Sequence, residues 1–326
     1  MVGKPIYVVP YLYNINLPEE DGLGVERRIA QEHKYNSIKN ENLEIQKSKE
    51  TQKPVIVVVA YPHVAITDDL TPLESDSRFE VEWRRSIIPQ IFPHTTCIIL
   101  PGSRLSLSDL LWLTKETGWG ECIKSHVEAG GHILGLCGGY QMLGMVLDDS
   151  LGIEGIKGKH DGLGLLPVET SIEPASCKIV EPQVAILLDH SEYKETREAQ
   201  ETSSKQNGLL VKGFELHCGR TNIVKNKIGS PTIVPLLHYL NKKVDGIQKE
   251  EGIQCGNVKG TYLHGILKSA AARRILLLGK GESSVDCTEE LEKKLDEKED
   301  PLDRLAHHLE HCGLGFDTLS RMVGLA

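Results

Sequence analysis

The sequence has little of several features that mark particular classes of protein. Aromatic residues make up only 5% of it, too few to expect the stacking platforms that bind single-stranded nucleic acid. The net charge is −9, whereas nucleic-acid binding needs positive patches. No run of about 18 apolar residues and no signal-peptide pattern is present. We therefore expect neither nucleic acid nor a membrane as a partner.

Two further absences concern cysteine and glycine patterns. The eight cysteines include no C-x-x-C pair, so we expect neither a zinc ribbon nor a disulfide framework, and no metal site. Reduced thiols of this kind are typical of a cytoplasmic protein. No G-x-x-x-x-G-K-[ST] loop occurs, so no nucleoside triphosphate cradle is expected, and no cofactor in this chain.

The distribution of apolar residues predicts an α/β fold. Val55–Val59 is a continuous β-branched run, typical of a strand buried on both faces of a parallel sheet. An acid-rich loop follows at residues 65–76, and after Asp148 the sequence becomes more β-rich. Further patterns predict strands at 79–83 and 96–100 and helices at 105–114 and 121–129. We predict a three-layer fold around an open, mostly parallel sheet, with a β-rich second half.

A cysteine stands at a predicted bend between a strand and a helix. The apolar stretch from His132 ends at Cys137, and helical spacing follows. Gly135 and Gly139 flank the cysteine at two residues on either side, which allows strand and helix to approach closely. A nucleophile elbow has the same mechanics. The start of a helix lowers the pKa of a thiol, so Cys137 is a candidate nucleophile, the alternative being a small buried core residue.

A cysteine nucleophile requires a base and donors for an oxyanion. His264 ends an apparent strand beside a glycine and is the preferred base, with His217 as its rival. The backbone N–H groups of Gly138, after the nucleophile, and Gly102, after the neighbouring strand, are the predicted oxyanion hole. Cys137 and Gly102 belong to the carboxyl edge of the sheet, where reactive groups gather in open α/β folds, and we expect His264 to reach the same edge.

Two charged residues are further candidates in the β-rich half. Strand alternation puts Glu215 on the same face as His217, where the pair can orient a substrate. Arg220 is a candidate clamp for a substrate carboxylate because of its planar fork, and a surface ion pair is the equal alternative.

At these residues the chain resembles a known family, the glutamine amidotransferase domain of cobyric acid synthases, among the triad (class I-like) amidotransferases. Five stretches carry the resemblance, in the same order as in the family: Leu100–Ser103, Gly135–Gly144, Gly162–Thr170, Gly213–Thr221 and Gly260–His264. The elbow is shared with cobyrinic acid a,c-diamide synthases. The stretch 162–170 looks closer to the cobyric acid synthases.

The resemblance implies that Cys137 hydrolyses glutamine to supply ammonia, with His264 as the acid and base and Gln141 holding the substrate. It also implies an ATP- and magnesium-dependent synthetase as partner, and a corrinoid carboxylate as ammonia acceptor, in cobalamin biosynthesis. Many triad amidotransferases carry a glutamate two residues after the histidine, where this chain has Ile266. The cobyric acid synthase group lacks it too, and we nominate Glu215 as third member of the triad.

The resemblance also suggests a division of the chain. We expect residues 1–53 to be the tail of a synthetase domain plus a polar linker, 54–280 the amidotransferase domain, and 281–326 a charged insertion and a helical segment. In full-length members a synthetase domain precedes the amidotransferase, and the chain begins too late to contain it. Two alternatives stay open: a non-catalytic, regulatory remnant of the fold, and a cysteine amidohydrolase acting on another amide.

Overall fold

The computed structural model describes nine segments of the chain. These are residues 9–10, 24–26, 28–29, 53–87, 94–190, 208–224, 232–244, 247–279 and 301–322. The polar linker predicted at 39–53 and the polar insertions predicted at 190–207 and 281–301 lie outside the described residues except for their end residues 53, 190 and 301. The chain divides into two units, one formed by Glu19–Val285 and the other by Met1–Pro18 with Asp286–Ala326. The larger unit contains the predicted amidotransferase segment 54–280.

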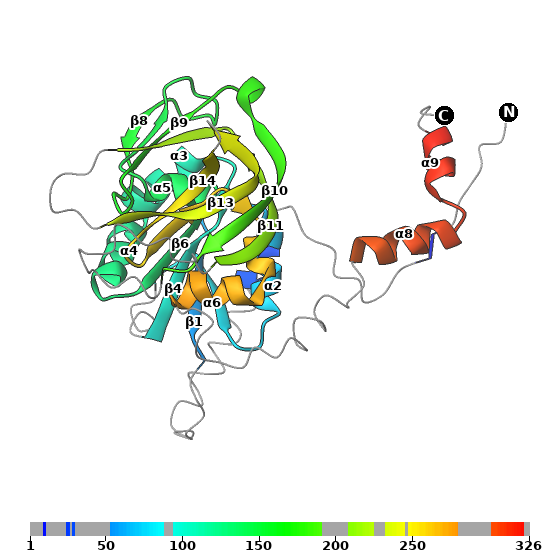
Figure 1. Ribbon diagram of the computed structural model, residues 1–326, viewed down its shortest axis with the longest axis horizontal. Helices are drawn as coiled ribbons and strands as arrows, with labels where there is room; N and C mark the ends of the chain where they lie inside the picture. The colour runs from blue at the N-terminus through cyan, green and yellow to red at the C-terminus, as the bar shows by residue number, and fades with distance from the viewer. Residues whose placement is uncertain are drawn as a thin grey trace, which may run out of the picture. The chain divides into compact units, whose positions relative to one another are not determined.

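A ten-stranded sheet forms the framework of the larger unit (Figure 1). In spatial order its strands are β16 (Leu263–His264), β11 (Gly208–His217), β10 (Ile179–Leu188), β13 (Ile233–Val244), β14 (Ile247–Cys255), β15 (Val258–Thr261), β6 (His132–Leu136), β4 (Thr95–Leu100), β1 (Val55–Val59) and β3 (Glu80–Arg84). The four pairings from β15 to β3 are parallel, and the five from β16 to β15 are antiparallel. The predicted α/β open sheet and β-rich second half are confirmed, and the second half joins the same sheet, so the whole sheet is mixed.

Helices cover both faces of the parallel strands. A Cβ atom placed on Gly135 of β6 would lie 2.6 Å from Leu143 Cδ1, so this face of the strand meets α5 (Gly138–Leu143). A Cβ atom on Gly279, at the end of α6 (Ala270–Leu278), would lie 2.8 Å from His132 Cε1. Because His132 and Gly135 are three residues apart on one strand, they face opposite sides of the sheet. The sheet is therefore the middle of three layers.

The remaining elements of this unit are short. The other helices whose bounds are described in full are η1 (Thr67–Leu70), α2 (Thr71–Glu74), α3 (Ser106–Leu111), η3 (Trp112–Glu116), α4 (Trp119–Glu128), η4 (Ala175–Cys177) and η5 (Ile266–Lys268). A second sheet has the order β12-β9-β7-β8, and β2 pairs with β5. The bounds of these strands are β2 (Val64–Ala65), β5 (Gly102–Ser103), β7 (Val146–Asp149), β8 (Gly158–Asp161), β9 (Val168–Ile172) and β12 (Gly219–Ile223).

The antiparallel half of the large sheet curls back on the parallel half. Only Tyr262 separates β15 from β16, yet β15 pairs with β14 and β6, whereas β16 pairs with β11 at the far end of the strand order. The segment 258–264 therefore contributes one strand to the interior of the sheet and one to its end. Strands β10, β11, β13 and β14 curve around so that β11 reaches β16 (Figure 1). This curl brings β11 and β16 to the carboxyl end of β6.

The smaller unit contains two described helices, α8 (Pro301–His311) and α9 (Phe316–Met322). Proline at the first position of α8 is favoured because its ring presets the helical φ and no N–H is needed there. His308 Nε2 lies 2.7 Å from the carbonyl oxygen of Pro10, which ties this helix to the N-terminal segment. The helical segment predicted for 302–325 thus consists of two helices over its described part.

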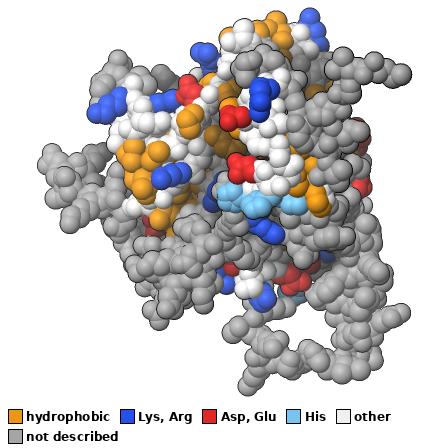
Figure 2. Space-filling view, turned by 90° about the vertical axis from the view of Figure 1, so that its right-hand side faces the viewer, with side chains coloured by type: hydrophobic (Ala, Val, Ile, Leu, Met, Phe, Trp, Pro, Cys, Tyr) orange, Lys and Arg blue, Asp and Glu red, His pale blue; other side chains and the backbone are white. Residues whose placement is uncertain are grey.

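Figure 2 shows how hydrophobic side chains of the described residues are distributed on one face. Hydrophobic side chains there lie in several separate groups between charged and uncharged polar ones (Figure 2). Scattered groups of this size are ordinary on protein surfaces. No helix in the described residues has the length and apolar character needed to cross a membrane.

The contact between α5 and β4 leaves no room for a side chain, which gives a first prediction. A Cβ atom on Gly139 would lie 1.9 Å from the carbonyl oxygen of Leu100. Because backbone cannot yield as a side chain can, we expect Gly139→Ala to lower the free energy of unfolding by about 1–3 kcal/mol, measured by urea denaturation.

The matched control is Gly120→Ala in α4. A Cβ atom there meets Thr114 Cγ2 at an ordinary 3.4 Å, so this variant should be neutral or slightly more stable. A Gly139→Ala protein as stable as Gly120→Ala would contradict the packing described here.

Candidate active site

Cys137 lies at the bend between β6 and α5, with a strained backbone. Its φ is 50° and its ψ is −108°, a conformation that residues with a side chain rarely adopt. Its backbone N–H donates to the carbonyl oxygen of Thr261 at 2.9 Å, and its thiol sulfur is 3.5 Å from the carbonyl oxygen of Leu216. The residue is 8% exposed. The strand, turn and helix predicted around this cysteine are present.

His264 is held in place by a carboxylate. Its Nδ1 is 2.6 Å from Asp69 Oδ2, and the other oxygen of Asp69 accepts a hydrogen bond from the backbone N–H of Gly265 at 2.7 Å. The ring stacks on Phe214, with centroids 5.1 Å apart. Its Nε2 is buried and has no nitrogen or oxygen partner among the described residues. The ring is thereby fixed, with one nitrogen occupied and the other left for a reacting group.

The surroundings of His264 favour its protonated form. Burial by itself would lower the pKa of the ring. Hydrogen bonds to Asp69 and to Cys137, together with the negative charges of both groups, outweigh burial and raise the pKa of His264 to about 10. Cys137 and Asp69 thus act on the ring of His264 in the same direction.

Asp69 was not among the residues predicted from the sequence. It lies in the short helix η1, which begins after Ile66, a residue with φ of 54°. Within the described segments, Ile66 and Cys137 are the two non-glycine residues with positive φ. The backbone is thus strained just before the helix that carries Asp69 and again at Cys137. The acid-rich loop at 65–76, which follows the first strand of the parallel sheet, was the sequence signal for this residue.

Glu215, nominated from the sequence as third member of a triad, belongs to another network. Its Oε2 accepts hydrogen bonds from Gln183 Nε2 at 2.8 Å and Lys242 Nζ at 3.1 Å. Burial raises the pKa of a carboxyl group, but the neighbouring His217 and the charges of Lys249 and Lys242 lower the pKa of Glu215 to about 2. The carboxylate that contacts His264 is that of Asp69, whereas Glu215 contacts Gln183 and Lys242.

His217, the rival base, is engaged elsewhere. Its Nδ1 is 2.7 Å from the carbonyl oxygen of Gly219, and its ring stacks on Tyr262 with centroids 3.7 Å apart. It lies on the same buried face of β11 as Glu215, as strand alternation predicted. The distance from His217 Nε2 to Glu215 Oε1 is 3.8 Å. His264 is therefore the histidine that the structure brings beside Cys137.

The two glycines predicted as oxyanion donors both lie against this group. Gly138 is the first residue of α5, so its N–H has no partner within the helix. A Cβ atom on Gly138 would lie 2.8 Å from the backbone nitrogen of Ser103. Gly102 is next to Ser103, and a Cβ atom on it would lie 3.8 Å from His264 Cε1. The strand β5 and the start of α5 thus flank the space beside Cys137.

The two residues predicted to bind substrate differ in position. Gln141 is 2% exposed in α5, and its Oε1 has no hydrogen-bond partner among the described residues. Its side-chain nitrogen lies against Gly219, where a Cβ atom would be 2.2 Å away. The side chain of Arg220 is 70% exposed and lies 4.0 Å from Glu173. Of its two sequence interpretations, the structure favours the surface ion pair.

Metal ligands do not gather in the described residues: no group of three or more His, Cys, Asp or Glu side chains there is placed to hold an ion. The chemistry that the described group can perform is nucleophilic. It comprises a strained cysteine, a histidine oriented by a carboxylate, and backbone donors beside both, which is the arrangement of an acyl-transfer site.

Comparison with known proteins agrees with this geometry. The CobB/CobQ-like glutamine amidotransferase domain matches residues 55–272. That match contains Asp69, Cys137 and His264.

Curated relatives extend the same comparison. A protein named cobyric acid synthase from Methylocella silvestris is 34% identical over 261 residues, which covers 79% of this chain and 46% of the relative. Another of that name, from Brucella anthropi, is 31% identical over 318 residues, covering 96% of this chain and 53% of the relative. The chain thus spans about half the length of the curated relatives it matches.

Solved structures give weaker similarities. PurLQS from Thermotoga maritima is 22% identical with a TM-score of 0.43, and the match covers 78% of this chain and 100% of that one. A glutamine amidotransferase from Thermotoga maritima is 14% identical with a TM-score of 0.39, covering 83% of this chain and 99% of that one.

The link between Asp69 and His264 predicts how stability varies with pH. Because the pKa of His264 is raised in the folded protein, from an unfolded value of about 6.5, its stabilising effect is complete below about pH 6.5 and is lost as the pH rises through the folded value of about 10. Asp69→Asn should therefore lose most stability relative to the wild type near pH 6, and the difference should shrink toward pH 10, measured by urea denaturation.

Asp68→Asn is the control, since it removes the same charge from the neighbouring, half-buried side chain. Its stability difference from the wild type should not follow this profile. A difference for Asp69→Asn that is flat or grows from pH 6 to pH 10 would contradict the assignment.

Proposed function

The chain belongs to the CobB/CobQ-like glutamine amidotransferase family, and we propose that Cys137, His264 and Asp69 are the triad with which it hydrolyses glutamine. The observation that carries the proposal is the 2.6 Å contact between Asp69 and His264, which orients the ring beside a cysteine at a strained bend. Family membership makes the side-chain amide of glutamine the substrate.

The first half of the reaction forms a thioester. His264 takes the proton of the Cys137 thiol, and the thiolate attacks the carbonyl carbon of the substrate amide. The backbone N–H groups of Gly138 and Gly102 stabilise the negative oxygen of the tetrahedral intermediate. His264 then gives its proton to the amide nitrogen, the C–N bond breaks, and ammonia leaves with the glutamyl group bound to sulfur.

The second half clears the enzyme. His264, now neutral, takes a proton from a water molecule as that water attacks the thioester carbon. Collapse of the second intermediate breaks the C–S bond, releases glutamate and returns the proton to the sulfur. Asp69 holds Nδ1 throughout and favours the ring form that has Nε2 facing the sulfur.

The fate of the ammonia is the second part of the proposal. In keeping with the name of the curated relatives, cobyric acid synthase, we assign the ammonia to ATP-dependent amidation of corrinoid carboxylates by a synthetase. ATP and magnesium belong to that synthetase. Gln141 is assigned to the glutamine site, since it lies one turn beyond the nucleophile and its amide oxygen is not yet bonded.

Release of ammonia and glutamate from glutamine tests the proposal. We expect slow hydrolysis by the wild type and a loss of at least about 100-fold in Cys137→Ala, because the bond-forming sulfur is gone. Cys177→Ala removes an exposed cysteine and should keep the wild-type rate.

Equal rates in the wild type and Cys137→Ala would overturn the proposal. A wild type that leaves glutamine intact but hydrolyses another amide through Cys137 would favour the cysteine amidohydrolase instead. A folded wild type that hydrolyses neither would favour the non-catalytic remnant.

A further inference from the structure

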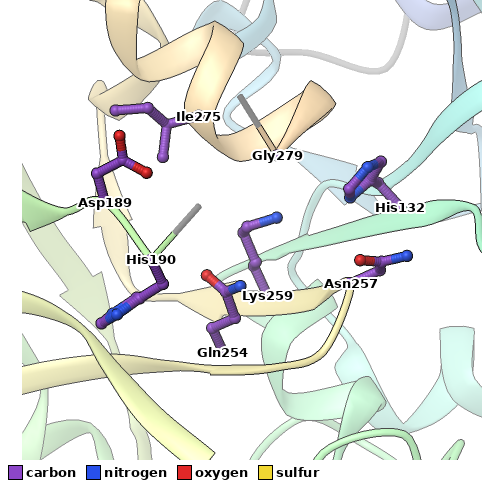
Figure 3. Close-up of a pocket in the computed structure, with 8 residues that line it drawn as sticks. All are labelled: His132, Asp189, His190, Gln254, Asn257, Lys259, Ile275 and Gly279. Carbon is purple, nitrogen blue, oxygen red and sulfur yellow. The ribbon is translucent and has the colours of Figure 1, made fainter. Parts of the chain in front are cut away.

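A second site lies at the opposite end of the parallel strands. A cavity of about 210 Å³ is lined by residues that include His132, Lys259, Asn257, Gln254 and Asp189, which are drawn in Figure 3. His132 begins β6 and Cys137 follows its last residue. At about 3.3 Å per residue these two positions are about 16 Å apart. The cavity is therefore separate from the proposed glutamine site.

Lys259 is an unusual member of this lining. It is 1% exposed, and its Nζ has no hydrogen-bond partner among the described residues. Figure 3 shows its side chain extending from β15 into the cavity. Burial lowers the pKa of this amine. A buried amine without a partner is unfavourable, so its position calls for a negatively charged group.

His132 presents a second unpaired nitrogen to the same region. Register places His132 opposite Cys97, and Leu134 opposite Lys259, so His132 and Lys259 lie on the same face of the sheet. Its Nδ1 is buried without a partner in the described part of the chain. Burial, followed by the positive charges of Lys259 and His126, lowers the pKa of His132 to about 4. Two groups that can carry positive charge thus stand close together, and neither nitrogen has a hydrogen-bond partner among the described residues.

The other lining groups suit an anion of limited charge. Asn257 and Gln254 bring amide N–H donors, of which each uses one for a backbone carbonyl, Gly130 and Gly256 respectively, and keeps a second. Asp189 lies across the cavity from Lys259 (Figure 3). It has an interaction partner of its own. Its carboxylate disfavours a bulky polyanion.

We propose that this cavity binds a small oxyanion, a carboxylate or phosphate group held between Lys259 and His132. A water molecule takes about 30 Å³ of liquid, so 210 Å³ holds a phosphate ion or a small organic acid. It is smaller than the roughly 300–1,000 Å³ of pockets for drug-sized ligands. The bound oxygens complete the hydrogen bonding of both unpaired nitrogens and neutralise the ammonium group.

Thermal unfolding of the full chain tests the site, with inorganic phosphate and acetate as probes at equal ionic strength against sodium chloride. A ligand that binds the folded state stabilises it. We expect one of the two probes, at a few millimolar, to raise the Tm of the wild type by roughly 2 °C or more. The probe that acts identifies the chemistry of the anion.

Lys259→Met should abolish that rise. Without oxyanion this variant should be at least as stable as the wild type, because an unpaired buried amine has been replaced by an apolar side chain. Lys159→Met, at an exposed position of β8, should keep the full response. Comparison at one phosphate concentration cancels the general stabilising effect of phosphate on folded proteins.

Two further variants keep the test decisive if Lys259→Met fails to fold. His132→Gln should weaken binding by isothermal titration calorimetry at least about threefold, and Asp189→Asn should strengthen it, since a repulsive charge is removed. No response of the wild type to either probe, an equal response in Lys259→Met, or loss of binding in Asp189→Asn would each overturn the proposal.

Discussion

The hydrogen bond between Asp69 and His264 is the interaction on which the candidate active site depends. It joins residues 195 positions apart in the chain, one in a short helix after the first strand and the other on the last strand of the sheet. Each oxygen of Asp69 has its own donor in the segment 264–265. The bond from Gly265 fixes the carboxylate next to His264, and the bond to Nδ1 then orients the ring.

The curled sheet supplies the other half of this arrangement. Glu251 holds the segment from β15 to β16 in place. Its carboxylate accepts hydrogen bonds from Thr261 Oγ1 at 2.5 Å and from the backbone N–H of Tyr262 at 2.7 Å. The carbonyl oxygen of Thr261 in turn accepts from the N–H of Cys137. Cys137 and His264 are therefore both attached to one short segment, so the curl of the sheet determines the spacing of these two residues.

Local sequence patterns predicted the parts of the site that local chemistry determines. The glycines around Cys137 are required by a backbone approach within a few residues, and His264 ends a strand beside Gly265, so both carry short-range signals. No short-range signal in the sequence distinguishes Asp69 from the nearby Asp68 and Asp76, because its position beside His264 depends on a residue far along the chain. We nominated Glu215 because strand alternation puts it on the same face as His217. The two residues do lie side by side, but Glu215 bonds to Gln183 and Lys242 and not to His264. The sequence also did not predict the burial of Lys259, because a single charged residue in a short strand carries no sign that its side chain is buried with its neighbours.

The central claim is that Asp69, and not Glu215, serves His264 in glutamine hydrolysis by Cys137. The most direct measurement is kcat/KM for ammonia release from glutamine by the wild type, Asp69→Asn and Glu215→Gln, each shown to be folded at the assay temperature. We predict a fall of roughly 100- to 10,000-fold for Asp69→Asn and of less than about tenfold for Glu215→Gln, which leaves the ring of His264 held. An Asp69→Asn enzyme that keeps its activity while Glu215→Gln loses it would contradict the account.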